Sequence, residues 1–493
     1  MLWLALHLPN LSLEVLASRS SPSAVVSHER IVVADDVAAA SGVLPGLRLA
    51  EAWGLLPALA IQERAAAREQ AALARLACWA GTFTSEVCVL PPQTLLLEVS
   101  GSLRLFGGTA LLFERIVRAC AEQGFAPRAA LAPTPLAAQW LALAGDAKPC
   151  LVSAQLPHRL ARLPLTVLGL SAQQQLRLAS FGVRSLADVL RLPRAGLTRR
   201  LGSGLATDLA RALGELPDPR PRFVFPERFV ERLELPVRVE NAMAIGFAGR
   251  CLIDALCGWL AVRGAGVSEC FFEFDHERGV RQRPATVLAL GFAAATRSAG
   301  RIRRVFGERL QGLALPAAVE RITLRAEAPA ALPSRTGSLF GQQGESAGGD
   351  SLAALVEGLQ ARLGSGRVHA LSVLAEHRPE NASRAIPPRL PAGEKFPARR
   401  PAAVQRDALP GPRPLWLLAR PQILREVAGR PQCGGPLRLL AGPERIESGW
   451  WDEAERGALG DVRRDYFVAV SPRAEWLWVF RSQIGWFLHG VFA

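Results

Sequence analysis

The acidic and imidazole side chains near the N-terminus could hold a divalent cation. His7 lies in an apolar stretch, Asp35 and Asp36 are adjacent, and Glu98 follows a second apolar stretch. Two-metal chemistry requires several carboxylates that converge on one place. The aspartate pair is more typical of a helix N-terminus, where a cap stabilises by about 0.5–2 kcal/mol. A single histidine in a buried strand is more often a hydrogen-bonded core residue, so we expect no metal site and no cofactor.

Other catalytic patterns are incomplete. Gly202-Ser203-Gly204 lacks the Gly-Lys-Ser/Thr end of a phosphate-binding loop, and no Ser-His-Asp or Cys-His arrangement stands out. The eight cysteines form no C-x-x-C pair and have no histidine at ligand spacing. We therefore predict buried, reduced thiols in a cytoplasmic protein.

The charge of the chain favours contact with phosphates. Its 58 Lys plus Arg residues exceed 44 Asp plus Glu, giving a formal charge of +14, and the lysines are only Lys148 and Lys395. A guanidinium binds oxyanions through two parallel hydrogen bonds, which suits nucleic acid. A GC-rich genome that encodes arginine in place of lysine is the alternative. No signal peptide opens the chain and no apolar run reaches 18 residues, so we predict no membrane segment.

The elements that must position these residues begin with an α/β region over 1–155. Apolar runs predict buried strands at 2–8 and 94–100, a further strand near 127–132, and helices over 64–80 and 109–123. A strand at 31–33 and two short helices separated by a glycine turn complete the region.

Residues 156–222 change to short helices with glycine-containing connections. Gly169 and Gly182 each stand between apolar residues, as in a helix-hairpin-helix that points backbone N–H groups at a DNA phosphate. An ordinary helix connector is the alternative. A stiff, proline-rich linker closes this region at 216–221.

Residues 223–330 predict an α+β domain with helices near 241–262 and 297–312 and strands near 268–275, 286–291 and 319–326. Around the second helix the arginines could face a nucleic-acid backbone, with a solvated helix face as the alternative. The predicted DNA-binding arginines are Arg297, Arg301, Arg303 and Arg304.

The C-terminal third alternates linkers with small folded segments. We predict a flexible linker over 331–350 in which Leu339 and Phe340 could anchor a partner, then a small extension over 351–383. A Pro/Arg-rich linker spans 384–414, and aromatic runs divided by glycine predict a small β domain over 415–493.

Three blocks of sequence resemble one family. They are Leu2-Trp3-Leu4-Ala5-Leu6-His7-Leu8-Pro9, the stretch from Leu96 to Gly108, and the tail Gly442-Pro443-Glu444-Arg445-Ile446-Glu447-Ser448-Gly449-Trp450-Trp451 with Asp461 to Tyr466. Together with the domain order, they resemble the Y-family lesion-bypass DNA polymerases and, within these, the ImuB-type proteins of bacterial mutagenesis cassettes. The resemblance implies a multidomain α/β fold with palm and fingers, a helix-hairpin-helix thumb, an α+β little finger and a C-terminal β-rich extension.

The resemblance also implies that the catalytic carboxylates are missing. Active members of the family hold their two metal ions with acidic residues at positions that correspond here to Ala5, Gln93 and Thr94. Their triphosphate contacts, a tyrosine and an arginine, correspond to Asp36 and Ala39, and an aspartate would repel a triphosphate. We therefore expect a protein that is not an enzyme.

Such a protein is expected to act as an adaptor during translesion synthesis in the SOS response to DNA damage. The resemblance implies that it binds primer-template DNA and bridges an error-prone C-family DNA polymerase, a RecA-like accessory protein and the sliding clamp in the cytoplasm, at the nucleoid. Clamp-binding motifs of the form Gln-x-x-Leu-Phe correspond here to Leu339 and Phe340 without the glutamine. The alternatives are a weak but active Y-family polymerase with a non-standard metal site and a non-specific DNA-binding repair factor.

Overall fold

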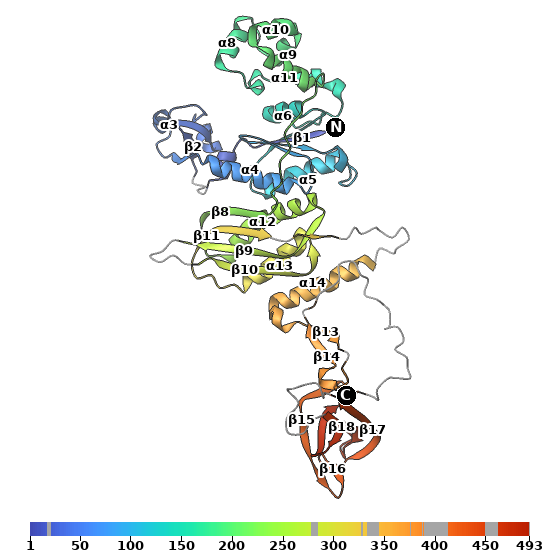
Figure 1. Ribbon diagram of the computed structural model, residues 1–493. Helices are drawn as coiled ribbons and strands as arrows, with labels where there is room; N and C mark the ends of the chain where they lie inside the picture. The colour runs from blue at the N-terminus through green and yellow to red at the C-terminus, as the bar shows by residue number, and fades with distance from the viewer. Residues whose placement is uncertain are drawn as a thin grey trace. The chain divides into compact units, whose positions relative to one another are not determined.

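The computed structural model (Figure 1) describes residues 1–16, 21–277, 284–326, 329–332, 345–374, 376–386, 388, 413–448 and 462–492. The chain forms two compact units. The first comprises 1–338 with 353–362, and the second comprises 339–352 with 363–493.

An antiparallel sheet forms the centre of the palm-like region. Its strand order is β5-β6-β1-β7, and the bounds are Val87–Leu90 for β5, Thr94–Glu98 for β6, Trp3–His7 for β1 and Arg128–Ala132 for β7. The strands predicted near 2–8, 94–100 and 127–132 are confirmed. Because the sheet is covered on both faces, its strands are almost entirely apolar.

Helices cover the two faces of this sheet separately. α4 (Ala66–Ala80) and α5 (Thr109–Glu122), both predicted, pack with Leu4 and Leu6. α6 (Pro135–Ala144) packs with Ala5 on the opposite face. The sheet therefore has an α4/α5 side and an α6 side.

A fingers-like lobe follows β1. Its sheet has the order β3-β2-β4, and the elements are α1 (Leu11–Glu14), β2 (Ser23–Ser27), β3 (Arg30–Ala34), α2 (Asp36–Ala40), α3 (Leu49–Leu55) and β4 (Ala60–Glu63). α1 ends at Glu14, and a turn follows at Val15.

The thumb-like region contains the predicted short helices. They are α7 (Leu156–Ala161), α8 (Ala172–Ser180), α9 (Leu186–Arg191), α10 (Arg194–Leu201) and α11 (Ser203–Leu213), with short 3₁₀ helices at Ser153–Gln155 and Leu165–Leu168. Their apolar faces continue the core on the α6 side of the palm sheet.

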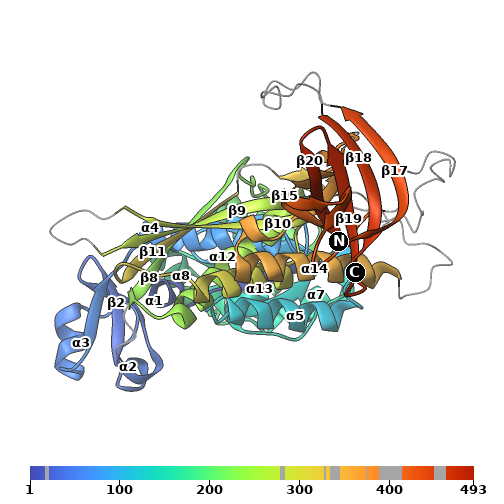
Figure 2. The same ribbon diagram turned by 90° about the horizontal axis from the view of Figure 1, so that it is seen from below.

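The little-finger-like domain is the predicted α+β unit. Its sheet has the order β10-β9-β11-β8, and its elements are β8 (Phe229–Val239), α12 (Ala242–Val262), β9 (Ala265–His276), β10 (Thr286–Thr296), α13 (Ala299–Gln311), β11 (Val319–Ala326) and the short β12 (Ala330–Ala331). Both helices pack on one face of this sheet (Figure 2). α12 is long and apolar enough to cross a membrane, but 67% of its apolar window is buried within the protein, as in a core helix.

The palm-like region and the little-finger-like domain meet where α12 crosses the end of α4. A Cβ atom added at Gly258 would stand 2.0 Å from the carbonyl oxygen of Cys78, and one at Gly81 would stand 2.7 Å from that of Gly258. Only glycine permits this approach, in which the two backbones touch. Cys78 belongs to the core of the little-finger-like domain.

The second unit contains the predicted C-terminal β domain. Its sheet has the order β16-β15-β20-β19-β18-β17, with bounds Trp416–Val427 (β15), Arg430–Gln432 (β16), Arg438–Ser448 (β17), Val462–Val470 (β18), Trp476–Ser482 (β19) and Gly485–Val491 (β20). A separate hairpin pairs β13 (Ala370–Val373) with β14 (Ser383–Ile386). α14 (Glu345–Leu363) precedes this hairpin in the chain, and residues 353–362 of the helix belong to the first unit.

A buried aromatic cluster forms part of the core of this β domain. Tyr466 stacks on Trp478 at 4.0 Å between ring centroids, and its hydroxyl lies 2.8 Å from Nδ1 of His489. Burial raises the pKa of Tyr466 to about 12 despite the neighbouring Arg464. Residues 384–386 of the linker predicted over 384–414 belong to β14, and the rest of that range falls mainly outside the described residues.

Candidate functional site: the palm mouth and the basic surfaces

The palm mouth lies at one end of β1, where the resemblance places the metal-binding carboxylates of active family members. Ala5 pairs with Leu96 and His7 pairs with Thr94, so these side chains share the α6 side of the sheet. Nδ1 of His7 lies 3.1 Å from Oγ1 of Thr94, and both side chains are buried. Gln93 precedes β6, and its carbonyl accepts a hydrogen bond from the N–H of Leu8.

The charge at the palm mouth is unfavourable for cations. His7 pairs on its other side with Arg128 of β7. Burial lowers the pKa of His7 to about 4, and the positive charge of Arg128 adds to this effect. The imidazole is therefore neutral near pH 7, and the nearest charged partner across the sheet is a guanidinium.

The other acidic candidates have local roles elsewhere. Glu98 stands opposite Trp3 at the far end of β1, and its carboxylate accepts hydrogen bonds from the N–H of Leu2 and from the hydroxyl of Ser100. Within the described residues, no three His, Cys, Asp or Glu side chains cluster closely enough to share a metal ion.

The acidic pair at the fingers-like lobe is a helix cap, as its sequence suggested. Asp35 caps α2 and accepts a hydrogen bond of 2.8 Å from the N–H of Ala38 and another from that of Ser23. Burial alone would raise the pKa of Asp35, but the hydrogen bonds from Ala38, Ser21 and Ser23 lower it overall. Asp36 is exposed and Ala39 is half-buried, so an acid and a methyl group stand at the expected triphosphate contacts.

The thumb-like hairpins leave both predicted glycines open. Gly169 and Gly182 have left-handed backbones, with φ of 59° and 74°, and neither has a heavy atom within 4 Å of an added Cβ. The following helices, α8 and α9, begin with capping boxes at Ser171 and Ser185. This geometry fits a close approach by an external backbone.

Exposed arginines around these hairpins were missed from the sequence. They are Arg177, Arg184, Arg199 and Arg200. The guanidinium of Arg200 stacks on the exposed ring of Phe181 at 4.4 Å. The closeness of Arg177 and Arg184 to Gly182 in sequence was a usable signal, since a phosphate needs cations beside the open N–H groups.

The arginines of α13 require a correction, because they are not one free basic face. Arg301 forms two hydrogen bonds with the fully buried carboxylate of Glu357, and Arg304 lies 3.8 Å from the same group. Arg303 forms an ion pair with Asp254. A buried carboxylate needs a cationic partner, so these arginines serve the fold, and Arg297 alone of the four predicted residues has no acidic partner within the described structure.

The open face of the little-finger-like sheet is balanced in charge. Arg321 lies 3.3 Å from Glu234 and 3.5 Å from Asp275, and Arg325 lies 2.7 Å from Glu273. A phosphate would have to compete with these carboxylates for each arginine. This face is therefore a weaker candidate for a nucleic-acid backbone than the thumb-like hairpins are.

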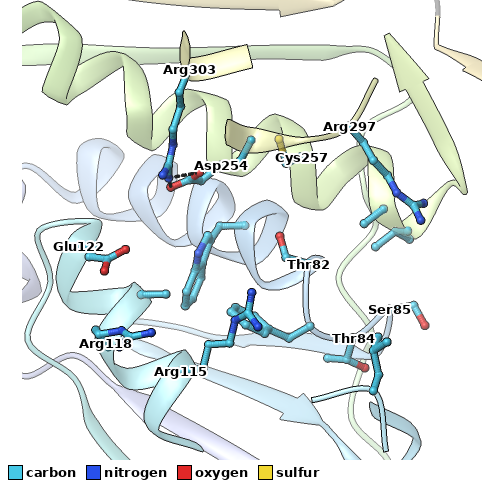
Figure 3. Close-up of a pocket in the computed structure, with 18 residues that line it drawn as sticks. Thr82, Thr84, Ser85, Arg115, Arg118, Glu122, Asp254, Cys257, Arg297 and Arg303 are labelled. Atoms are coloured by element: carbon cyan, nitrogen blue, oxygen red, sulfur yellow. Dashed lines mark hydrogen bonds and ion pairs between the residues drawn. The ribbon is translucent and has the colours of Figure 1, made fainter. Parts of the chain in front are cut away.

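A cleft of about 750 Å³ lies between the palm-like region and the little-finger-like domain, on the α4/α5 side of the palm sheet (Figure 3). Arg115 and Arg118 of α5 line one wall, and Arg303 with Asp254 lines the opposite wall. Arg297 is also part of the lining. The palm mouth lies on the α6 side, so the cleft is a separate site.

Two sequence predictions about interaction sites and thiols have different outcomes. Leu339 and Phe340, the predicted clamp anchor, lie outside the described residues. All eight cysteines are free thiols, and seven of them are buried, which confirms the predicted buried thiols.

Comparison with known proteins identifies relatives over most of the chain. Residues 11–142 match the impB/mucB/samB family. Protein ImuB of Caulobacter vibrioides strain NA1000 / CB15N is 28% identical over 477 residues, covering 92% of this chain and all of the relative. Protein ImuB of strain ATCC 19089 / CIP 103742 / CB 15 gives the same values.

Solved structures with a similar arrangement include an insertion ternary complex of Dbh DNA polymerase, at 16% identity and a TM-score of 0.40. DinB from Sulfolobus solfataricus is 15% identical with a TM-score of 0.38. Each match covers 67% of this chain and 99% of the solved chain.

The family match and the full-length relatives confirm the resemblance to ImuB-type proteins. The predicted α/β multidomain fold with a C-terminal β-rich domain is confirmed as well. The chain therefore resembles the ImuB proteins over most of its length.

Proposed function

We propose that this chain is a non-catalytic, DNA-associated adaptor of bacterial translesion synthesis. One observation carries the proposal: a buried His7–Thr94 contact, with Arg128 on the neighbouring strand, occupies the palm mouth. Phosphoryl transfer by a polymerase requires carboxylates that hold two magnesium ions there. A neutral imidazole, a hydroxyl and a guanidinium cannot provide that charge.

DNA contact is proposed for the thumb-like hairpins. Gly169 and Gly182 leave room for a phosphate beside the backbone, and Arg177, Arg184, Arg199 and Arg200 supply exposed positive charge. The ion-paired sheet of the little-finger-like domain supports a smaller share of the contact. This division of roles suits an adaptor that associates with primer-template DNA without orienting a nucleotide for reaction.

The partners are proposed from similarity to Protein ImuB over 92% of the chain. We propose that the chain joins an error-prone C-family DNA polymerase, a RecA-like accessory protein and the sliding clamp at damaged DNA, in the cytoplasm. The region from 351 to the C-terminus, with its compact β domain, is the proposed location for protein partners.

Primer extension tests the non-catalytic role. Purified chain is incubated with a labelled primer-template, all four nucleotides, and Mg²⁺ or Mn²⁺, beside an active Y-family polymerase as the positive control. We expect no template-dependent extension with either metal. Extension that persists through successive purification steps and is lost when Glu98 or Asp35 is neutralised would establish the alternative, a polymerase with a non-standard metal site.

Co-purification tests the adaptor role. The full chain is expected to retain the error-prone polymerase, the RecA-like protein or the clamp. Deletion of 415–493 should release a partner bound by the β domain, and Leu339→Ala with Phe340→Ala should release the clamp. Retention of every partner by both variants would contradict these assignments, and failure of the full chain to retain any partner would favour a simple DNA-binding factor.

A further inference from the structure

The cleft between α5 and the little-finger-like domain is chemically distinct from the rest of the surface. Four arginines and two acids line it. Arg303 neutralises Asp254, to which the side-chain amide of Gln123 also donates a hydrogen bond of 2.7 Å. The remaining acid, Glu122, shares the cleft with Arg115, Arg118 and Arg297.

Three of these arginines are available to a ligand. Arg115, Arg118 and Arg297 are exposed, and within the described residues none of them has an ion-pair partner. Arg115 and Arg118 are three positions apart on α5, so they lie on neighbouring positions of one helical surface. The ring of Phe106 lies 5.3 Å from the guanidinium carbon of Arg115 and limits its movement. The cleft therefore presents partly ordered cations to an anionic ligand.

The apolar part of the lining narrows the choice of ligand. Trp79 and Phe83 are 3% and 5% exposed, so their rings are unavailable as stacking platforms for bases. Leu105, by contrast, is 80% exposed at the edge of the cleft. An exposed aliphatic side chain beside arginines matches a peptide that combines acidic residues with an apolar anchor.

The size of the cleft agrees with a peptide. Ligand sites commonly enclose about 300–1,000 Å³, and this cleft of about 750 Å³ falls within that range. The exposed hydroxyls of Thr82 and Ser85 add donors beside the arginines. Carboxylates of an extended peptide can accept paired hydrogen bonds from guanidinium groups, which a lysine could not donate in the same geometry.

We propose that this cleft binds an acidic peptide segment of a partner protein, with an apolar residue of that segment packed on Leu105. The inference does not depend on the proposed function, because the cleft lies on the opposite side of the palm sheet from the palm mouth. An acidic segment could dock there whether or not the chain catalyses nucleotide transfer. The charge of the site, and not the identity of the partner, defines what it recognises.

Fluorescence anisotropy of the full chain tests this proposal. The probe is a fluorescein-labelled peptide of alternating glutamate and leucine, and the competitor is an unlabelled oligothymidylate. Wild-type chain should bind the peptide saturably. The double variant Arg115→Glu/Arg118→Glu should bind it at least about tenfold more weakly, because two attractive contacts become repulsive. Leu105→Ser should weaken binding by a smaller factor.

The matched control is Lys148→Glu/Arg162→Glu, which makes the same charge change at two exposed cationic side chains outside the cleft, beside the core on the α6 side of the palm sheet. It should bind the peptide within about twofold of wild type, after correction for the weak effect of distant charges. Circular dichroism should show that all variants remain folded, since the substituted side chains are exposed.

Three results would overturn the proposal. The wild-type chain could fail to bind the peptide saturably, or the control variant could lose as much affinity as the cleft variant. The third is displacement of the peptide by the oligonucleotide together with a greater loss of oligonucleotide binding in the cleft variant. That result would assign the cleft to a nucleic-acid strand.

Discussion

Neutralising two thumb-like arginines is expected to reduce DNA affinity and its dependence on salt. The double variant Arg184→Gln/Arg199→Gln removes two exposed guanidinium groups of the thumb-like region that form no ion pair with a described residue. If each contacts one phosphate, the slope of log affinity against log salt concentration should become less steep by about 1.8. At about 0.1 M salt each contact corresponds to roughly eightfold in affinity, so the pair should cost roughly 60-fold.

The assay is a salt titration of duplex binding by fluorescence anisotropy, with the wild-type chain measured in parallel. Arg321→Gln/Arg325→Gln is the matched control, because it removes the same formal charge from arginines that already have carboxylate partners. The control should leave the slope nearly unchanged. Equal changes in slope for the two variants would refute the reasoning, since DNA would then respond only to net charge. A larger change in the control would place the main phosphate contacts on the sheet.

Three further predictions concern stability. Glu357→Gln leaves Arg301 without its carboxylate partner and should lower the free energy of unfolding by about 3–5 kcal/mol in a urea titration, against at most about 1 kcal/mol for the half-exposed control Glu273→Gln. Equal losses would show that burial of this pair is unimportant. Gly258→Ala should lower the free energy of unfolding by about 1–3 kcal/mol or more, seen as a lower thermal midpoint, because its Cβ would overlap the carbonyl of Cys78. Gly246→Ala on the same helix should leave the midpoint nearly unchanged. A small effect of equal size in both variants would contradict the close backbone contact. Burial lowers the pKa of His7 to about 4 from 6.5, so between these pH values the unfolded chain binds a proton at this imidazole and the folded chain does not, and the free energy of unfolding falls as pH falls from about 6.5 to 4. His7→Gln should therefore flatten the loss of stability in that pH window, and an unchanged profile would contradict the burial of a neutral ring.

The sequence predicted the palm strands because a sheet covered on both faces leaves continuous apolar runs. It missed β8, where Pro236 interrupts an alternating run, and the structure places β8 at the edge of its sheet, where a proline is tolerated. It also missed α6, although Thr134 caps this helix and Pro135 occupies its first turn, two ordinary signals of a helix start.

The side-chain partners were beyond what sequence could predict. Arg301 is 56 positions from Glu357, and Arg303 is 49 positions from Asp254. The arginines along α13 suggested a basic face, since the neighbouring sequence contains no information about those distant acids. The cleft could not be predicted from sequence either. Its walls come from α4, α5, α12 and α13, and only the packing of these helices brings the arginines together. The palm mouth was predicted to lack acidic residues, but the contribution of Arg128 required the pairing of β7 with β1.

The crossing of α12 over α4 has a consequence for how the molecule melts. Cys78 belongs to a core made mostly of little-finger-like residues, and Phe223 and Phe225 of the connecting segment pack against that core and the palm core alike. Cooperative unfolding follows shared apolar contacts, and not the boundaries between named domains. The two regions should therefore lose structure together in one transition, whereas a chain with the same lobes joined only by a tether would melt in separate steps.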